Sequence, residues 1–275
     1  VPMAGVDARF PLISTDGPAT HLLEPAVMFV VTPQGLNSDK IIDEDSRSVE
    51  FDDSNLFDPN RYPGYDRVEE GARFNVGGRY GGDFGNGLRA DATLGRVFRL
   101  VEDTAFSQGT GLAGRQSDYV GSWGVSYRDD FSFSHRFRID DELEGFNRNE
   151  LRGEVALGPL DVAATYFFLE EDATAGADED RSEMTLDAAL QVNRNIAFRG
   201  EMRRDLQNDQ MIDVGGSVEF ATECASLEVY AERDFTSSGD SPSSIAFGLR
   251  VRLFAEPDGA RDKSPLCAPQ LSREP

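Results

Sequence analysis

The stretch that decides the fold is SDYVGSWGVSYRDDFSFSHRFRID, residues 117–140. Apolar and aromatic side chains alternate with serine and arginine on both sides of the short polar turn RDD. The second half shows this most plainly, because Phe133 lies between Ser132 and Ser134. Two-residue alternation around a turn predicts a β-hairpin with one apolar face and one polar face.

The same alternation extends in both directions, and helical periodicity is almost absent. The pattern predicts about thirteen strands. They lie near residues 4–13, 20–32, 71–80, 88–94, 119–127, 131–139, 150–157, 160–168, 184–190, 196–203, 212–220, 227–231 and 243–254. Pro11 and Pro25 fall roughly opposite each other in the first pair, so pairing there should be weak or bulged. The sequence therefore predicts an all-β, antiparallel protein.

The connections between these strands alternate between short turns and longer loops. The short ones are at 14–20, 81–87, 128–130, 158–159, 193–195 and 221–224, and the longer ones are near 33–66, 101–116, 140–149, 170–182, 205–209 and 235–242. A soluble β-sandwich also has alternating strands, but it has no reason to sort its loops by length. A transmembrane β-barrel has short turns on one rim and longer loops on the other, and we predict such a barrel.

Composition agrees with this prediction. The formal net charge of −23 argues against a nucleic-acid-binding protein. The chain contains no run of about 18 apolar residues, so it does not predict a transmembrane helix. In a barrel, the apolar faces contact lipid and the faces rich in Arg, Glu and Ser line a wet interior. Because an odd set of antiparallel strands begins and ends in the same direction, we expect further strands before Val1.

Several stretches resemble one known family. EDSRSVEFDDSNLF (44–57) and NRYPGYDRVEEGARFNVGGRYG (60–81) resemble a signature of the lipopolysaccharide-assembly outer-membrane family LptD, also called the organic-solvent-tolerance protein, OstA. Similar stretches follow in the same order, namely GRVFRL (95–100), residues 117–140, NRNE (147–150) and ECASLEVYAERDF (223–235). The resemblance is of an alphaproteobacterial type and covers most of the chain. It implies that residues 1–254 are the C-terminal part of a barrel of about 26 strands.

The resemblance implies transport of lipopolysaccharide (LPS) in the outer membrane of a Gram-negative cell. Family members receive LPS from an LptA-like periplasmic bridge protein through an N-terminal domain that lies outside this chain. They insert LPS into the outer leaflet at the cell surface, and an LptE-like lipoprotein plugs the barrel. Lipid leaves through a seam between the first and last strands. One side of that seam would be formed here by Ile245, Phe247, Leu249, Val251 and Leu253.

Two cysteines are candidates for a disulfide, because the periplasmic rim is oxidising. The alternation of loop lengths places Cys224 in a short turn on the periplasmic rim, and the resemblance implies that the family uses a cysteine at this point to bond its periplasmic domain. Enteric-type members have adjacent cysteines at this point, but here Cys224 follows Glu223. Cys267 lies in the polar tail 255–275, which we expect in the periplasm. A single Cys224–Cys267 bridge and a bond to the missing N-terminal part both remain open.

Arginines on the polar faces are candidates for contact with LPS or with the plug. They are Arg73, Arg79, Arg89, Arg136, Arg138, Arg199, Arg203, Arg250 and Arg252. A guanidinium group suits phosphate, although ion pairs with Asp91, Glu150, Glu154 and Glu201 of the wall are the simpler expectation. Trp123, Tyr119 and Tyr166 fit an interfacial girdle, and His135 is expected to pack among phenylalanines and not to bind a ligand.

The longest loop is expected to fold inward over the lumen, with carboxylates toward water, sugar or arginines. Its candidate residues are Asp43, Glu44, Asp45, Glu50, Asp52, Asp53, Phe57, Tyr62 and Tyr65. A second acidic group follows at 170–180. Both could bind calcium, but neither has EF-hand spacing, and a solvated acidic face is the simpler expectation. We therefore predict no metal site and no cofactor.

Other functions remain open at this stage. No nucleophile–base arrangement or phosphate-binding loop is present, so we predict that the chain is not an enzyme. A passive porin-type channel is the first alternative to an LPS translocon, and a soluble β-sandwich binding module is the second.

Overall fold

The structure is a computed structural model that describes residues 1–37, 49–101, 106, 108–171, 179–222, 225–236 and 243–253. Its strands are β1 (Ala4–Arg9), β2 (Leu12–Asp16), β3 (Ala19–Thr32), β4 (Gly71–Asp83), β5 (Leu88–Arg99), β6 (Tyr119–Tyr127), β7 (Phe131–Ile139), β8 (Phe146–Leu157), β9 (Leu160–Leu169), β10 (Arg181–Asn193), β11 (Ile196–Asp205), β12 (Gln210–Ala221), β13 (Ala225–Asp234) and β14 (Ser244–Leu253). The described residues also contain a short 3-10 helix, η1 (Gln108–Thr110). No helix in the described part of the chain is long and apolar enough to cross a membrane.

The strands follow one another in a sheet, in the order β1-β3-β4-β5-β6-β7-β8-β9-β10-β11-β12-β13-β14, and β2 also pairs with β3. Every pairing whose register is described is antiparallel. The all-β antiparallel prediction is therefore confirmed. β1 and β2 are two segments of one expected strand, because the pairs Arg9–Ala26 and Leu12–Leu23 share a register. Pro11 interrupts the pairing, as expected, but no bulge forms there.

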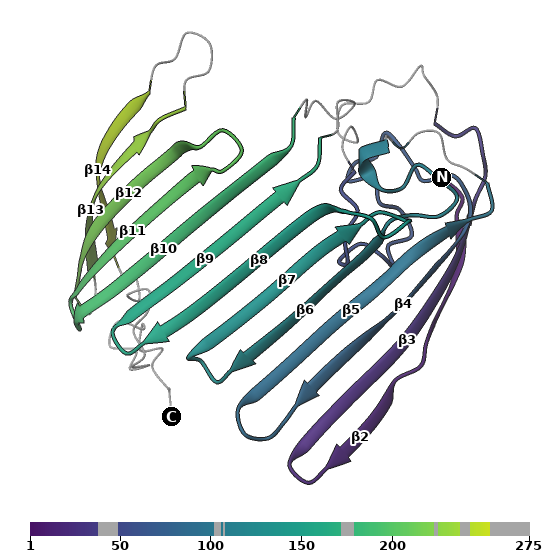
Figure 1. Ribbon diagram of the computed structural model, residues 1–275, viewed down its shortest axis with the longest axis horizontal. Coiled ribbons are helices and arrows are strands. Elements are labelled where there is room, and N and C mark those ends of the chain that lie inside the picture. Colours follow the sequence, from purple (N-terminus) through teal and green to yellow (C-terminus); the bar gives the residue numbers. More distant parts are fainter. Residues whose placement is uncertain are drawn as a thin grey trace, which may run out of the picture. The chain divides into compact units, whose positions relative to one another are not determined.

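The chain divides into two compact units, which are described separately. Unit 1 comprises residues 1–153 and 165–182, and unit 2 comprises residues 154–164 and 183–275. Figure 1 shows the strands of each unit lying side by side, with neighbours running in opposite directions. In both units, most hairpins alternate between short turns and longer loops, as predicted. The exception is the connection between β11 and β12 at 206–209, which is as short as the turn at 84–87.

The strands bury their polar face and expose their apolar face. On β4, Phe74 is 37% exposed, whereas its neighbour Arg73 is 1% exposed. Unit 2 shows the same reversal on β12, where Phe220 is exposed and Glu219 is buried. Exposed apolar side chains at alternate positions on strand after strand are the lipid-facing pattern of a membrane barrel. A soluble sandwich would bury these side chains in a core.

Candidate functional site

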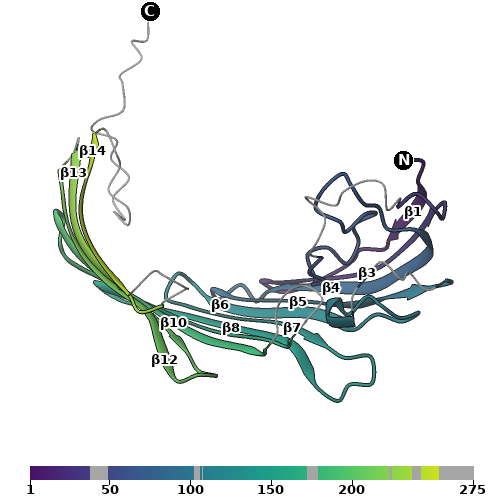
Figure 2. The ribbon, with the colours of Figure 1, turned by 90° about the horizontal axis from the view of Figure 1, so that it is seen from above.

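Two loops cover the polar face of the sheet in unit 1. The 49–70 loop, from the connection between β3 and β4, lies against one face of the neighbouring strands (Figure 2). The 106–118 loop lies between β5 and β6. An apolar cluster joins the loops to the strands, and its members are Val49, Phe51, Leu56, Tyr62, Val97, Phe106, Leu112 and Val120. The expectation that the longest loop folds inward is therefore met by the part of it that the structure describes.

Leu56 of the 49–70 loop packs against two glycines of the sheet. It is fully buried, and it rests on Gly77 of β4 and Gly95 of β5, which are register partners. A Cβ atom at Gly95 would collide with the Leu56 side chain and would lie 2.6 Å from the Val76 carbonyl oxygen. The two glycines therefore leave a slot for Leu56, because any other residue at these two positions would fill it with a side chain.

Glu69 is the centre of a buried cluster of charges, which we call the Glu69 cluster. Arg61 donates two hydrogen bonds to its carboxylate, with N–O distances of 2.9 and 2.7 Å. The Arg73 Nε atom lies 3.3 Å from the same carboxylate, and Arg99 also donates to it. Arg61 and Glu69 come from the loop, whereas Arg73 and Arg99 come from β4 and β5. The cluster therefore fastens the loop to the sheet.

The electrostatics of the Glu69 cluster favour an ionised carboxylate. Burial by itself raises the pKa of Glu69, but the charges of Arg61, Arg73 and Arg99 outweigh it, so the pKa lies below its ordinary value. Backbone carbonyl groups accept further donors of the cluster; Arg61, for example, donates to the carbonyls of Asn55 and Leu56. Loss of one member of such a dry ion cluster costs about 3–5 kcal/mol, because the other charges stay buried.

The acidic residues of the 49–70 loop pair with arginines of β7 and β8. Asp53 accepts hydrogen bonds from Arg136 Nε at 2.8 Å and from Ser122 Oγ at 2.7 Å. Arg148 lies 2.5 Å from Glu50 and 3.6 Å from Asp52. These contacts align the loop along neighbouring strands, and the described carboxylates of the first acidic group, Glu50, Asp52 and Asp53, are paired with arginine.

The 106–118 loop has its own arginine anchor. Arg138 Nε lies 3.3 Å from Asp118, and its terminal nitrogens donate to the carbonyls of Gly109 and Thr110 at 2.6 and 3.1 Å. Burial raises the pKa of Asp118 above its ordinary value, although Arg138 and a hydrogen bond from Asn147 act in the opposite direction. Arg138 thus holds groups of the protein's own chain.

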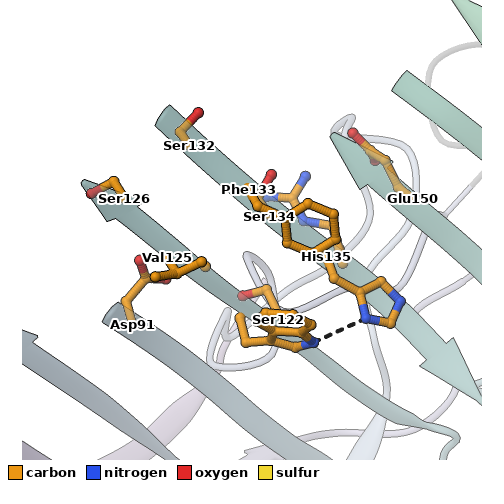
Figure 3. A pocket seen from close by; sticks show the side chains of 12 residues that line it. Asp91, Ser122, Val125, Ser126, Ser132, Phe133, Ser134, His135 and Glu150 are labelled. Carbon is orange, nitrogen blue, oxygen red and sulfur yellow. Dashed lines mark hydrogen bonds between the residues drawn. The ribbon is translucent and has the colours of Figure 1, made fainter. Parts of the chain in front are cut away.

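An open recess of about 300 Å³ is lined by residues of β6 and β7 (Figure 3). By the two-residue alternation, its polar side is formed by Asp91, Ser122, Ser126, Ser132, Ser134, Arg136 and Glu150, and we call it the serine recess. Gly124 lies in its floor, with the Asp91 carboxylate above it, 3.1 Å from the position of a Cβ atom. Asp53 binds Ser122 and Arg136 and so bounds the recess on one side.

The opposite, apolar face carries a chain of polar contacts. Trp123 Nε1 donates to His135 Nδ1 at 3.0 Å, which leaves the proton of a neutral His135 on Nε2, 2.9 Å from Asn149 Oδ1. Phe133 and Phe137 lie around this group. The expected packing of His135 among phenylalanines is confirmed, and its hydrogen bonds explain how a polar ring is accommodated on the lipid-facing side.

In unit 2, the polar face carries a ladder of ion pairs. Arg199 donates to Glu219 at 2.6 Å, and Arg250 donates to Glu228 at 2.7 Å. Arg252 lies 3.8 Å from Glu219 and 3.9 Å from Glu228. Arg203 pairs with Asp213 at 2.9 Å. Most of these pairs connect neighbouring strands, and Arg252 of β14 also approaches Glu219 of β12, as expected for the wall of a barrel.

Most of the predicted arginines are paired with carboxylates of this chain. Arg89, for example, pairs with Asp83, and the exposed Arg79 lies opposite Glu24 in the register. The simpler expectation of ion pairing is confirmed, and the carboxylates described as the closest partners of these arginines are Asp53, Glu69, Asp83, Asp118, Asp213, Glu219 and Glu228. In unit 1, the partners come largely from loops that fold back onto the wall, and sequence spacing does not reveal such contacts. Contact with LPS or with a plug stays a prediction.

Other candidate residues have different outcomes. Tyr62 is buried and stacks on Phe106, and Arg9 lies over the ring of Phe57. Tyr65 is 100% exposed. The seam residues of β14 are exposed, with Phe247 at 80%. Asp43, Glu44, Asp45, Cys224, Cys267 and the tail 255–275 lie outside the described residues. Among the described residues, no group of three His, Cys, Asp or Glu side chains could hold a metal ion.

Comparison with known proteins identifies the family. The family model described as "LptD: LPS transport system D" matches residues 1–196. The chain belongs to the LptD family. Membership makes it an outer-membrane protein of LPS transport, with LPS as the substrate. No curated protein is similar enough to count as a match.

Solved structures of a porin from Rhodopseudomonas blastica are also similar to this chain. A triple mutant of that porin has a TM-score of 0.42 and 13% identity, over 92% of this chain and 81% of the porin. Another mutant has a TM-score of 0.37 and 11% identity, over 91% of this chain and 89% of the porin.

Sequence reasoning missed the residues that fasten the loops. Glu69, Arg61, Arg99 and Arg148 were not singled out, and nor was the glycine pair beneath Leu56. One signal was available, because Glu69 and Arg61 both belong to the stretch 60–81 that most resembles the LptD family signature. The burial of a charged residue can be predicted only when the segment that folds over it is known.

Proposed function

We propose that this chain is the C-terminal part of the barrel of an LPS translocon, which inserts LPS into the outer leaflet of a Gram-negative outer membrane. The observation that carries the proposal is the LptD family match over residues 1–196. The reversed burial of the strands supports it, because polar groups face inward and apolar groups face outward. We propose a transport role without catalysis and without a cofactor.

The exit route is proposed at the last strand. Ile245, Phe247, Leu249, Val251 and Leu253 are all exposed on β14. β14 pairs with β13 on one side, and it ends the strand order of the sheet. An edge strand with free backbone groups can open and close against a partner strand, and such an opening would let the lipid part of LPS leave sideways.

Two partners belong to the same proposal. An LptE-like lipoprotein would contact the polar face as a plug, and an LptA-like bridge protein would deliver LPS through an N-terminal domain. Arginines of the polar face are the candidate contacts, and the exposed Arg79, Arg89 and Arg250 are the most accessible of them.

Depletion of the full-length gene product tests the proposal. Cells that express the gene from a repressible promoter are shifted to repression, and LPS is measured on the intact cell surface with an antibody. We expect surface LPS to fall and newly made LPS to accumulate in the inner membrane, with recovery when the wild-type gene is restored. A passive porin would leave surface LPS unchanged, and that result would overturn the proposal.

A further inference from the structure

Arg96 of β5 lies on the lipid-facing side of the sheet, unlike the arginines of the polar face. Its neighbours Gly95 and Val97 face the loops, because Leu56 rests on Gly95 and Val97 belongs to the apolar cluster. Two-residue alternation therefore turns Arg96 toward the opposite face, where its register partner is the exposed Val76. A cation on this face of a membrane barrel is costly unless a partner compensates its charge.

Aromatic rings surround the guanidinium group of Arg96. Its central carbon atom lies 4.2 Å from the centroid of the Tyr119 ring and 5.2 Å from the centroid of the Phe98 ring. The residue is 7% exposed, so packing fixes the direction of its side chain. Contacts between a cation and aromatic rings are stronger where water is excluded, and they stabilise the charged group at this position.

The Arg96 side chain reaches toward the rim that carries the longer loops. Its Nη2 atom donates to the Ser117 carbonyl oxygen at 2.5 Å, and Ser117 belongs to the loop that precedes β6. β5 ends at Arg99, so Arg96 lies close to this rim. Long cationic side chains on a lipid-facing surface reach in this way for the layer of lipid head groups.

Most of the hydrogen-bonding capacity of Arg96 is unused within the part of the chain that the structure describes. A guanidinium group has five N–H donors, and the Ser117 carbonyl is the acceptor described for Arg96. Its Nε atom is buried without an acceptor, and no described carboxylate forms an ion pair with it. Phosphate is the common anionic group of membrane lipids, and its oxygens match the fork of guanidinium donors.

Unit 2 has a similar arrangement at Arg233 of β13. The register partners of Arg233 are Val214 and Ile245, which are both exposed apolar residues. The guanidinium carbon of Arg233 lies 4.4 Å from the centroid of the Phe235 ring, and β13 leads into the longer loop 235–242. Each unit therefore places an arginine over an aromatic ring on the apolar face, beside a longer loop.

We infer that Arg96 and Tyr119 bind the phosphate group of a membrane lipid that borders the barrel at the rim of the longer loops. The guanidinium group supplies the charge, and the Tyr119 hydroxyl can donate a further hydrogen bond. The exposed Val76, Leu94 and Phe98 provide apolar surface for the acyl chains. The inference concerns the outer wall of the barrel. It uses the outer-membrane location of the family and does not depend on the translocon proposal.

Photo-crosslinking of the purified full-length protein in detergent tests the inference. A benzophenone amino acid replaces Val76, the register partner of Arg96. A matched control carries it at Val218, which is similarly exposed and has the apolar register partners Phe198 and Val229. Each protein is mixed with the phosphorylated lipid anchor of LPS, the same anchor without phosphate, phosphatidylglycerol or diacylglycerol. We expect phosphate to raise the adduct from position 76 about tenfold and to leave the adduct from position 218 unchanged.

The two pairs of lipids identify the source of the phosphate. Dependence on phosphate in the LPS pair alone assigns the site to LPS, and dependence in the other pair alone assigns it to a phospholipid. Dependence in both pairs supports a site for either lipid. Equal adducts with and without phosphate in both pairs, or the same dependence at position 218, would overturn the inference.

Substitution of Arg96 locates the contact. Arg96→Gln should abolish the preference for phosphate at position 76, whereas Arg96→Lys should keep part of it. Arg250→Gln makes the same change of charge on the polar face and should leave the preference intact. An undiminished preference in Arg96→Gln would assign the contact to other groups and overturn the role of Arg96. Should Arg96→Gln fail to fold, which heat-modifiable migration reports, the comparison of positions 76 and 218 decides by itself.

Discussion

The polar faces of the two units carry the same kinds of residue in different environments. In unit 1, Glu69 is 0% exposed, and its arginine partners are covered by the 49–70 loop. In unit 2, Arg250 is paired with Glu228, but its side chain remains 52% exposed. Both sets are arginine–carboxylate pairs on the polar face, but in unit 1 the carboxylate belongs to the loop that covers the pairs.

This difference decides how much each ion pair contributes. An exposed pair is screened by water and contributes little, whereas a member removed from a buried cluster leaves uncompensated charges in a dry site. Unit 1 therefore has a packed interior on its polar face, with apolar residues and buried charges, while the ladder of unit 2 retains access to water. The following experiments are ordered by expected effect.

The largest effect is expected from Glu69→Gln. The substitution leaves Arg61, Arg73 and Arg99 without their common carboxylate, so the free energy of unfolding should fall by about 3–5 kcal/mol. Urea unfolding of the protein purified in detergent measures the loss, and protease cleavage within the 49–70 loop reports its release. Glu232→Gln, at an exposed position on β13, is the matched control. Equal stability of the two variants would contradict the role of the cluster.

A smaller effect is expected from filling the glycine slot. Gly95→Val places atoms where Leu56 and the Val76 carbonyl lie, and overpacking of this kind costs about 1–3 kcal/mol. The same unfolding measurement applies. Gly200→Ala should change little, because a Cβ atom there meets only the Gly215 carbonyl oxygen at 3.9 Å. Addition of Leu56→Ala to Gly95→Val should restore part of the loss, and an additive loss would count against the slot.

Acid should release the 49–70 loop through Glu69. Its pKa is lowered in the folded protein, whereas the pKa of a glutamate in an unfolded chain is about 4.3. The stabilisation is therefore complete above the unfolded pKa and is lost as the pH falls through the lower folded pKa. Protease sensitivity of the loop, measured across acidic pH, should rise in the wild-type protein. In Glu69→Gln, this part of the pH dependence should vanish, and an identical profile would assign the acid response to other groups.

The smallest effect is expected from Arg250→Gln in unit 2. Because this side chain is half exposed, loss of its pair with Glu228 should change the free energy of unfolding by less than about 1 kcal/mol. Comparison with Glu69→Gln in the same urea titration gives the contrast between the units directly. A loss as large as that of Glu69→Gln would show that the ladder is as dry as the Glu69 cluster.

The sequence by itself determined the fold class and the direction of each face. Alternation is a local property, since successive side chains of a strand point to opposite sides whatever surrounds them. The hairpin at 117–140 and the exposed apolar row on β14 could therefore be predicted from residue order. The alternating loop lengths likewise predicted which connections are short, except at 206–209. The resemblance of residues 44–81 to the family signature could also be recognised from residue order alone.

Only the tertiary structure decided which charges are buried and what they touch. Arg136 was predicted on the polar face, but its partner Asp53 is distant in the sequence, and nothing in the alternation connects them. The same holds for Glu69 with Arg99 and for Leu56 with Gly95. Such contacts depend on the path of a long loop, and that path is set by the summed burial of apolar groups and by paired charges, not by local preference.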